Sequence, residues 1–138
     1  MPVNVYWRDT EQTIMCFDCI GRWTWKELID ATHTSYDMAD SVPHRVDAVV
    51  NLTDGRYLPG GAFGQINTLA RRGRDNWQLG VIVGANQVVK AMITMFKQLY
   101  SESGQHFVFA ETVDDALALI AAQREQAHSA TEAHDPRP

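Results

Sequence analysis

The sequence has few cysteines, a deficit of basic residues and no long apolar run. Its 138 residues include two cysteines, and 12 Lys and Arg against 17 Asp and Glu give a formal net charge of −5. Two cysteines are too few for a disulfide framework, so we expect a reducing, cytoplasmic location. The acidic balance argues against a nucleic-acid partner. No apolar run approaches the ~18 residues of a membrane span, and the N-terminus has none suited to secretion, so we predict no membrane span.

Several motifs that mark a reaction or a cofactor are also missing. The sequence contains no G-x-S-x-G, no G-x-G-x-x-G and no H-x-x-x-H. Cys16 and Cys19 form a C-x-x-C pair, but both lie in a predicted strand, where their side chains point to opposite faces. We interpret them as core packing rather than as a zinc or redox site. We therefore predict no metal, no cofactor and no catalytic residue, and expect a non-enzymatic protein.

The sequence does contain a complete pattern of strands and helices. Val3, Val5 and Trp7 alternate with polar residues, and strand-forming residues recur over residues 13–20, which predicts a β-hairpin. Thr24-Trp25-Lys26-Glu27 is a capping box, and an apolar stripe at helical spacing extends from it to about Ser41. Further strands are expected at residues 46–52, 79–83 and 106–110, and further helices at about residues 62–72, 87–100 and from 112 onward.

The predicted order of elements is β-β-α-β-α-β-α-β-α. A hairpin followed by strand–helix units predicts an α/β fold with a mixed five-stranded sheet and four helices. Residues 1–123 would form this single domain. Helical periodicity fades from about Glu125, so residues 124–138 are expected to be a flexible C-terminal tail.

Polar residues follow the central predicted strands. Asn51, Thr53 and Asp54 open a long loop that ends at Gly60 and Gly61, and Asn86 follows the next strand and can also cap a helix. In open α/β sheets, ligands bind beyond the carboxyl ends of the strands, and long loops in compact domains are often functional. We therefore predict a binding site for a ligand or partner at these six residues.

The order of elements resembles the STAS domain (sulfate transporter and anti-sigma-factor antagonist) over about residues 3–123. Local similarities are Gly-Arg-Trp-Thr-Trp-Lys-Glu at residues 21–27 and Glu-Thr-Val-Asp-Asp-Ala-Leu at residues 111–117. The resemblance is to the uncharacterised bacterial members, and it implies a regulatory module without enzymatic activity. In phospho-regulated members an Asp-Ser pair follows the central strand. Here that place reads Asn51-Leu52-Thr53-Asp54, so the resemblance makes Thr53 the candidate for phosphorylation.

Two functions stay open from the sequence. The first is a module that binds a regulatory protein through the 53–61 loop and the helix after it. The second is a protein that binds a small nucleotide-like or lipid-like molecule at the polar carboxyl ends of the strands. A homodimer is also expected, because Tyr6, Trp7, Trp23 and Tyr57 are more aromatic side chains than a small core readily hides.

Overall fold

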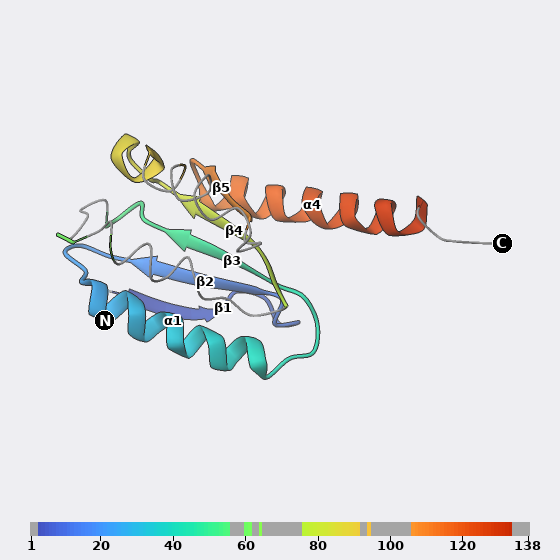
Figure 1. Cartoon of the computed structure of the whole chain (residues 1–138), viewed down its shortest axis with the longest axis horizontal. Coiled ribbons are helices and arrows are strands. Elements are labelled where there is room, and N and C mark those ends of the chain that lie inside the picture. Colours follow the sequence, from blue (N-terminus) through green and yellow to red (C-terminus); the bar gives the residue numbers. More distant parts are fainter. Residues whose placement is uncertain are drawn as a thin grey trace.

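The computed structural model describes residues 3–55, 60–61, 64, 76–91, 94 and 106–133 (Figure 1). The strands are β1 (Val3–Trp7), β2 (Ile14–Cys19), β3 (Val46–Asn51), β4 (Trp77–Val83) and β5 (His106–Ala110), and the long helices are α1 (Trp25–Asp40) and α4 (Val113–Ala133). The strands form one sheet in the order β1-β2-β3-β4-β5. β1 is antiparallel to β2, and the other neighbours are parallel. The predicted α/β fold with a mixed five-stranded sheet is therefore confirmed.

Two of the four predicted helices are described only in part. Residues 87–91 are helical, as expected for the helix after Asn86, and the predicted helix at 62–72 lies outside the described residues apart from the helical Gly64. α4 continues to Ala133, so the predicted domain boundary at residue 123 falls inside a helix. Ala, Glu and Gln dominate the added residues, and their high helix propensity extends the helix where an apolar stripe no longer does.

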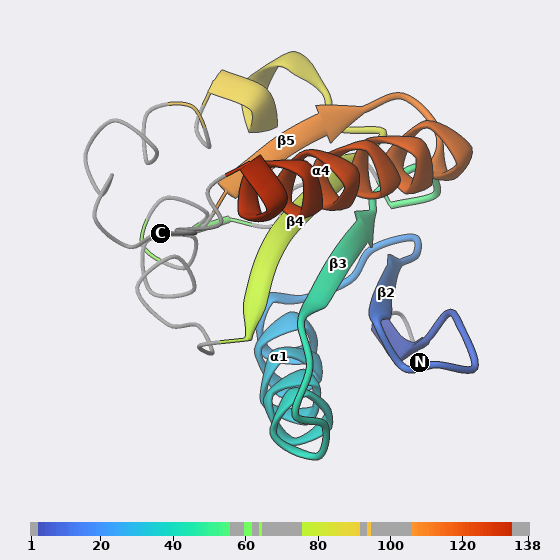
Figure 2. The ribbon, with the colours of Figure 1, turned by 90° about the vertical axis from the view of Figure 1, so that its right-hand side faces the viewer.

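The two long helices lie on opposite faces of the sheet (Figures 1 and 2). Alternation along β3 shows this arrangement, because Ala48 packs in a cluster with α1 and Val49 packs in a cluster with α4. Large aromatic side chains fill the α1 side, whereas the α4 side is built on valines and the small Ala116 of α4. α4 contacts β3, β4 and β5, and α1 contacts β1 and β2.

The start of α1 is set by its capping box. The Glu27 amide donates to the Thr24 hydroxyl at 3.2 Å, and the Thr24 amide donates to the Glu27 carboxylate at 2.9 Å. These two hydrogen bonds satisfy amides that the helix itself leaves without acceptors. The capping box read from the sequence is therefore confirmed.

The end of α1 is held by a residue from a distant part of the chain. The Asn76 side-chain amide, just before β4, donates to the carbonyls of Ala39 at 2.9 Å and His44 at 3.1 Å. Ala39 lies in the last turn of α1, where carbonyls lack intrahelical donors. Asn76 thus joins the helix end to the entrance of β3 and β4.

We expect Thr24→Ala to lower the free energy of unfolding by about 1 kcal/mol, because it removes the acceptor for the Glu27 amide. Urea unfolding followed by circular dichroism would measure this. The matched control is Thr34→Ala on the exposed face of the same helix, where the hydroxyl only bonds back to the Asp30 carbonyl. A loss at Thr34 equal to the loss at Thr24 would contradict the capping role.

Candidate functional site

The carboxyl ends of the parallel strands meet at one edge of the sheet, as the sequence predicts. The ladder continues just beyond the strands: the Leu52 amide donates to the Val83 carbonyl at 2.8 Å, and the Gly84 amide donates to the Ala110 carbonyl at 3.2 Å. Gly84 has φ +75°, and a Cβ on it would lie 2.9 Å from Thr53. The segment after β3 therefore rests directly on the end of β4.

Residues 52–55 form a turn at this edge, which we call the Thr53–Asp54 turn. The Asn51 side chain accepts a hydrogen bond from the Thr53 amide at 3.1 Å, and the Gly55 amide donates to the Leu52 carbonyl at 3.1 Å. Asn51 is half-buried, whereas Thr53 and Asp54 are exposed. The turn therefore presents two polar residues, Thr53 and Asp54, to solvent, and its backbone is held by local hydrogen bonds.

The same turn is also fastened to the connection between β2 and α1. The Gly21 amide donates to the Asp54 carbonyl at 2.8 Å, and the Trp23 indole donates to the Gly55 carbonyl at 2.8 Å. A Cβ at Gly55 would stand 2.4 Å from the Cys19 carbonyl oxygen, so only glycine fits there. The fully buried Trp23 thus anchors the exposed turn to the core.

The other predicted site residues are placed less closely. Asn86 is exposed, and its side chain accepts from the Val89 amide at 3.0 Å, which confirms its role as a helix cap. Gly60 and Gly61 are exposed, and no described atom lies within 4 Å of a Cβ built on either. The structure therefore brings Asn51, Thr53 and Asp54 together, while the described contacts do not join the two glycines to them.

The cysteine pair behaves as the packing interpretation predicts. Cys16 and Cys19 are free and buried, and they belong to the α4 and α1 clusters respectively. Burial raises the pKa of Cys19 to about 12 and raises the pKa of Cys16 as well.

Over the described ranges, no group of three His, Cys, Asp or Glu residues could hold a metal ion. None of the helices within those ranges is long and apolar enough to cross a membrane.

One argument for a homodimer is corrected by the fold. Trp23 is 2% exposed and contacts Trp25 edge to face at 5.0 Å between ring centroids, so it is a core residue. Trp7 is half-buried, and Tyr57 lies outside the described residues. Of the four aromatic residues, only Tyr6 is described as exposed, at 38%.

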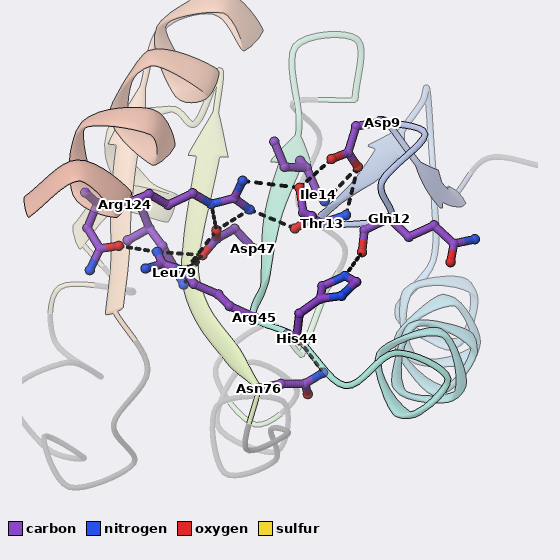
Figure 3. A network of polar contacts seen from close by, with 11 residues as sticks. Asp9, Gln12, Thr13, Ile14, His44, Arg45, Asp47, Asn76, Leu79 and Arg124 are labelled. Atoms are coloured by element: carbon purple, nitrogen blue, oxygen red, sulfur yellow. Dashed lines mark hydrogen bonds and ion pairs between the residues drawn. The ribbon is translucent and has the colours of Figure 1, made fainter. Parts of the chain in front are cut away.

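A second polar site, which sequence reasoning missed, lies at the opposite edge of the sheet (Figure 3). Asp47 in β3 is 1% exposed, and its carboxylate accepts from the guanidinium of Arg45 at 2.9 Å and from that of Arg124 at 2.7 Å. Arg124 comes from the middle of α4, and it also donates to the Thr13 carbonyl at 3.0 Å. The Asp47 site therefore connects α4 to β3 and to the start of β2.

The backbone of β4 explains why a carboxylate is needed there. The pairing of β3 with β4 shifts between Val46 and Ala48, because β4 has one extra residue in the stretch opposite Asp47. Such a bulge leaves a backbone amide outside the ladder. The Leu79 amide donates to the Asp47 carboxylate at 3.0 Å. The sequence held one signal for this site, an acidic residue inside the apolar run of residues 46–50.

The Asp47 site continues into the β1–β2 turn through Thr13. The Thr13 and Ile14 amides donate to the Asp9 carboxylate at 2.9 Å and 3.0 Å, and the Thr13 hydroxyl also donates to it. Burial acts to raise the pKa of Asp9, but the hydrogen bonds from Thr13 and Ile14 outweigh it and hold the pKa below its ordinary value. The Asp9 carboxylate is thus favoured in the folded protein.

Comparisons with known proteins leave the family open. No protein-family model, no curated protein and no solved structure matches the chain.

We expect Asp47→Asn to lower the free energy of unfolding by about 3 kcal/mol, because two guanidinium groups lose the buried carboxylate they share. Urea unfolding would measure the loss. Asp30→Asn is the matched control, since Asp30 pairs with Lys26 on the exposed surface of α1 and should contribute little. Equal stability of the wild type and Asp47→Asn would contradict the role of the carboxylate.

Asp9 should contribute to stability only above the pKa it has when folded. Its folded pKa lies below the unfolded value of about 3.9, so the stabilisation is present above that value and is lost as the pH falls through the folded pKa. Between pH 5 and about pH 2, the wild type should therefore lose more stability than Asp9→Asn. Urea titrations at several pH values would show this as a flatter profile for the variant. Parallel profiles would contradict it.

Proposed function

We propose that this chain is a STAS-like regulatory module that binds a partner protein through the Thr53–Asp54 turn and the segment after it. The proposal rests on one observation: hydrogen bonds hold an exposed polar turn in a fixed position. Asn51, Gly21 and Trp23 hold its backbone or its flanks, while the side chains of Thr53 and Asp54 face solvent. A loop already held in one conformation loses little entropy on binding, so such a turn suits recognition.

The order of elements supports the STAS-like part of the proposal. A hairpin is followed by α1 and then by parallel strands, with α4 after the last strand. Thr53 stands directly beyond the central strand, close to where the phospho-regulated members carry their serine. Thr53 is an exposed residue, and phosphorylation by a kinase requires exposure. Phosphorylation there would add about two negative charges beside Asp54 and change the charge that a partner meets.

The alternative is a small-molecule binder at the same edge. Asn51 ends β3, Thr53 follows it, and Gly84 and Asn86 follow β4; open sheets hold ligands at this position. A nucleotide-like or lipid-like ligand that binds only the folded state raises the melting temperature. A rise of several degrees with nucleotides or acyl-CoAs, abolished by Asn86→Ala, would favour this alternative.

We expect Thr53→Glu and Asp54→Ala to reduce capture of the partner at least about tenfold. Tagged wild type and variants would be used to capture proteins from extract of the source cells, with quantification by mass spectrometry. Thr10→Glu and Glu11→Ala are matched controls, since both residues are exposed on the β1–β2 turn at the other edge of the sheet. Unchanged amounts of every captured protein in the Thr53 and Asp54 variants would overturn the assignment of this surface.

A further inference from the structure

A single tryptophan reaches the Thr53–Asp54 turn from the core. Trp23 lies between β2 and α1 and is 2% exposed. Its indole N–H donates to the Gly55 carbonyl at 2.8 Å, between residues 32 positions apart in the sequence. A phenylalanine could also pack in the core, but it has no group that donates a hydrogen bond. The indole of Trp23 therefore makes a contact that apolar packing alone does not require.

The start of α1 sets the position of this indole. Trp23 directly precedes the N-cap Thr24, whose capping box with Glu27 fixes where the helix begins. The ring of Trp25, the first residue of α1, contacts the Trp23 ring edge to face, with the centroids 5.0 Å apart. The indole is thus held from the helix side, and its N–H is held from the side of the turn.

The turn fits closely against the connection between β2 and α1. A Cβ at Gly55 would lie 2.4 Å from the Cys19 carbonyl oxygen and 3.0 Å from the Trp23 ring. The Gly21 amide donates to the Asp54 carbonyl at 2.8 Å, one residue before the carbonyl that the indole binds. Two segments that are distant in the sequence therefore meet at three successive points.

The indole favours one conformation of the turn. Gly55 is bonded through both of its backbone groups, because its amide donates to the Leu52 carbonyl at 3.1 Å and its carbonyl accepts from Trp23. If the turn moved away, the buried indole N–H would lose its acceptor. A buried donor left without an acceptor costs more free energy than an ordinary hydrogen bond contributes. The closed position of the turn is therefore stabilised by more than its own local bonds.

We propose that Trp23 is a positioning residue for recognition at the Thr53–Asp54 turn. By holding the Gly55 carbonyl, its indole keeps the exposed residues Thr53 and Asp54 in one position relative to α1. A partner then meets a turn that needs little ordering, and without the indole N–H only a fraction of the molecules carries the closed turn. The proposal rests on the function proposed above for its choice of binding surface, whereas the hydrogen bond is testable in the free chain.

Trp23→Phe tests this hydrogen bond, because it keeps an aromatic ring in the core and removes the donor. Amide hydrogen exchange followed by NMR should become at least about tenfold faster at Gly21 and Gly55. The amides of Val46 and Leu79, which are hydrogen-bonded near the amino ends of β3 and β4, should change much less. Equal acceleration at all four amides would show a general loss of stability and would overturn the proposal, as would no acceleration at Gly21 and Gly55.

Trp77→Phe is the matched control. Trp77 contacts the rings of Phe17 and Tyr36 edge to face, and within the part of the chain that the structure describes its indole nitrogen has no hydrogen-bond partner. Its replacement should not accelerate exchange selectively at Gly21 and Gly55. Selective acceleration there by Trp77→Phe would contradict the role of the Trp23 N–H. Should Trp23→Phe fail to fold, a Trp23 analogue with benzothiophene in place of indole keeps the ring shape without the N–H, and the same result is expected.

Capture of proteins from cell extract separates this proposal from the proposed function. If the turn binds a partner, folded Trp23→Phe should reduce capture of that partner about tenfold, because fewer molecules carry the closed turn. Full capture by a variant with fast exchange at Gly21 and Gly55 would overturn the positioning role. If Thr53→Glu and Asp54→Ala leave all capture unchanged while Trp23→Phe still accelerates exchange at the turn, the indole holds the turn and the proposed function is wrong.

Discussion

The buried carboxylate of Asp47 is the interaction on which the arrangement of the sheet and α4 depends. One charged group satisfies the Leu79 amide, which the bulge in β4 leaves outside the ladder, and binds Arg45, just before β3, and Arg124 of α4. A carboxylate with no exposed surface is costly to bury unless its oxygens are fully hydrogen-bonded, and here the described contacts provide those bonds. The position of α4 over β3 and β4 is therefore specified by charge as well as by apolar packing.

The Asp47 site and the candidate binding edge lie at opposite ends of the strands, and they differ in how their residues are buried and hydrogen-bonded. At the amino ends, Asp47, Arg124 and Thr13 join elements far apart in sequence; Asp47 is buried, and Arg124 and Thr13 are half-buried. At the carboxyl ends, the Thr53–Asp54 turn is held by its backbone and leaves its side chains exposed. The buried ion pairs thus lie at the amino ends of the strands, and the exposed residues of the Thr53–Asp54 turn lie at the carboxyl ends.

Local patterns determined most of the fold from the sequence alone. Strand alternation, the capping box at Thr24 and the cap at Asn86 each depend on residues within a few positions of one another, and the structure confirms them. The grouping of Asn51, Thr53 and Asp54 at one edge follows from a general rule about the carboxyl ends of parallel strands, so the sequence predicts it. α4 is longer than the apolar periodicity predicts, because Ala, Glu and Gln have high helix propensity and continue the helix to Ala133 after the apolar stripe ends.

The sequence by itself determined the elements, their order and the absence of an extended apolar segment, since these follow from short-range periodicity and composition. Only the tertiary structure decided which distant residues meet. Asp47 and Arg124 are 77 positions apart and Asn76 reaches Ala39 over 37, and no local pattern reports such pairs.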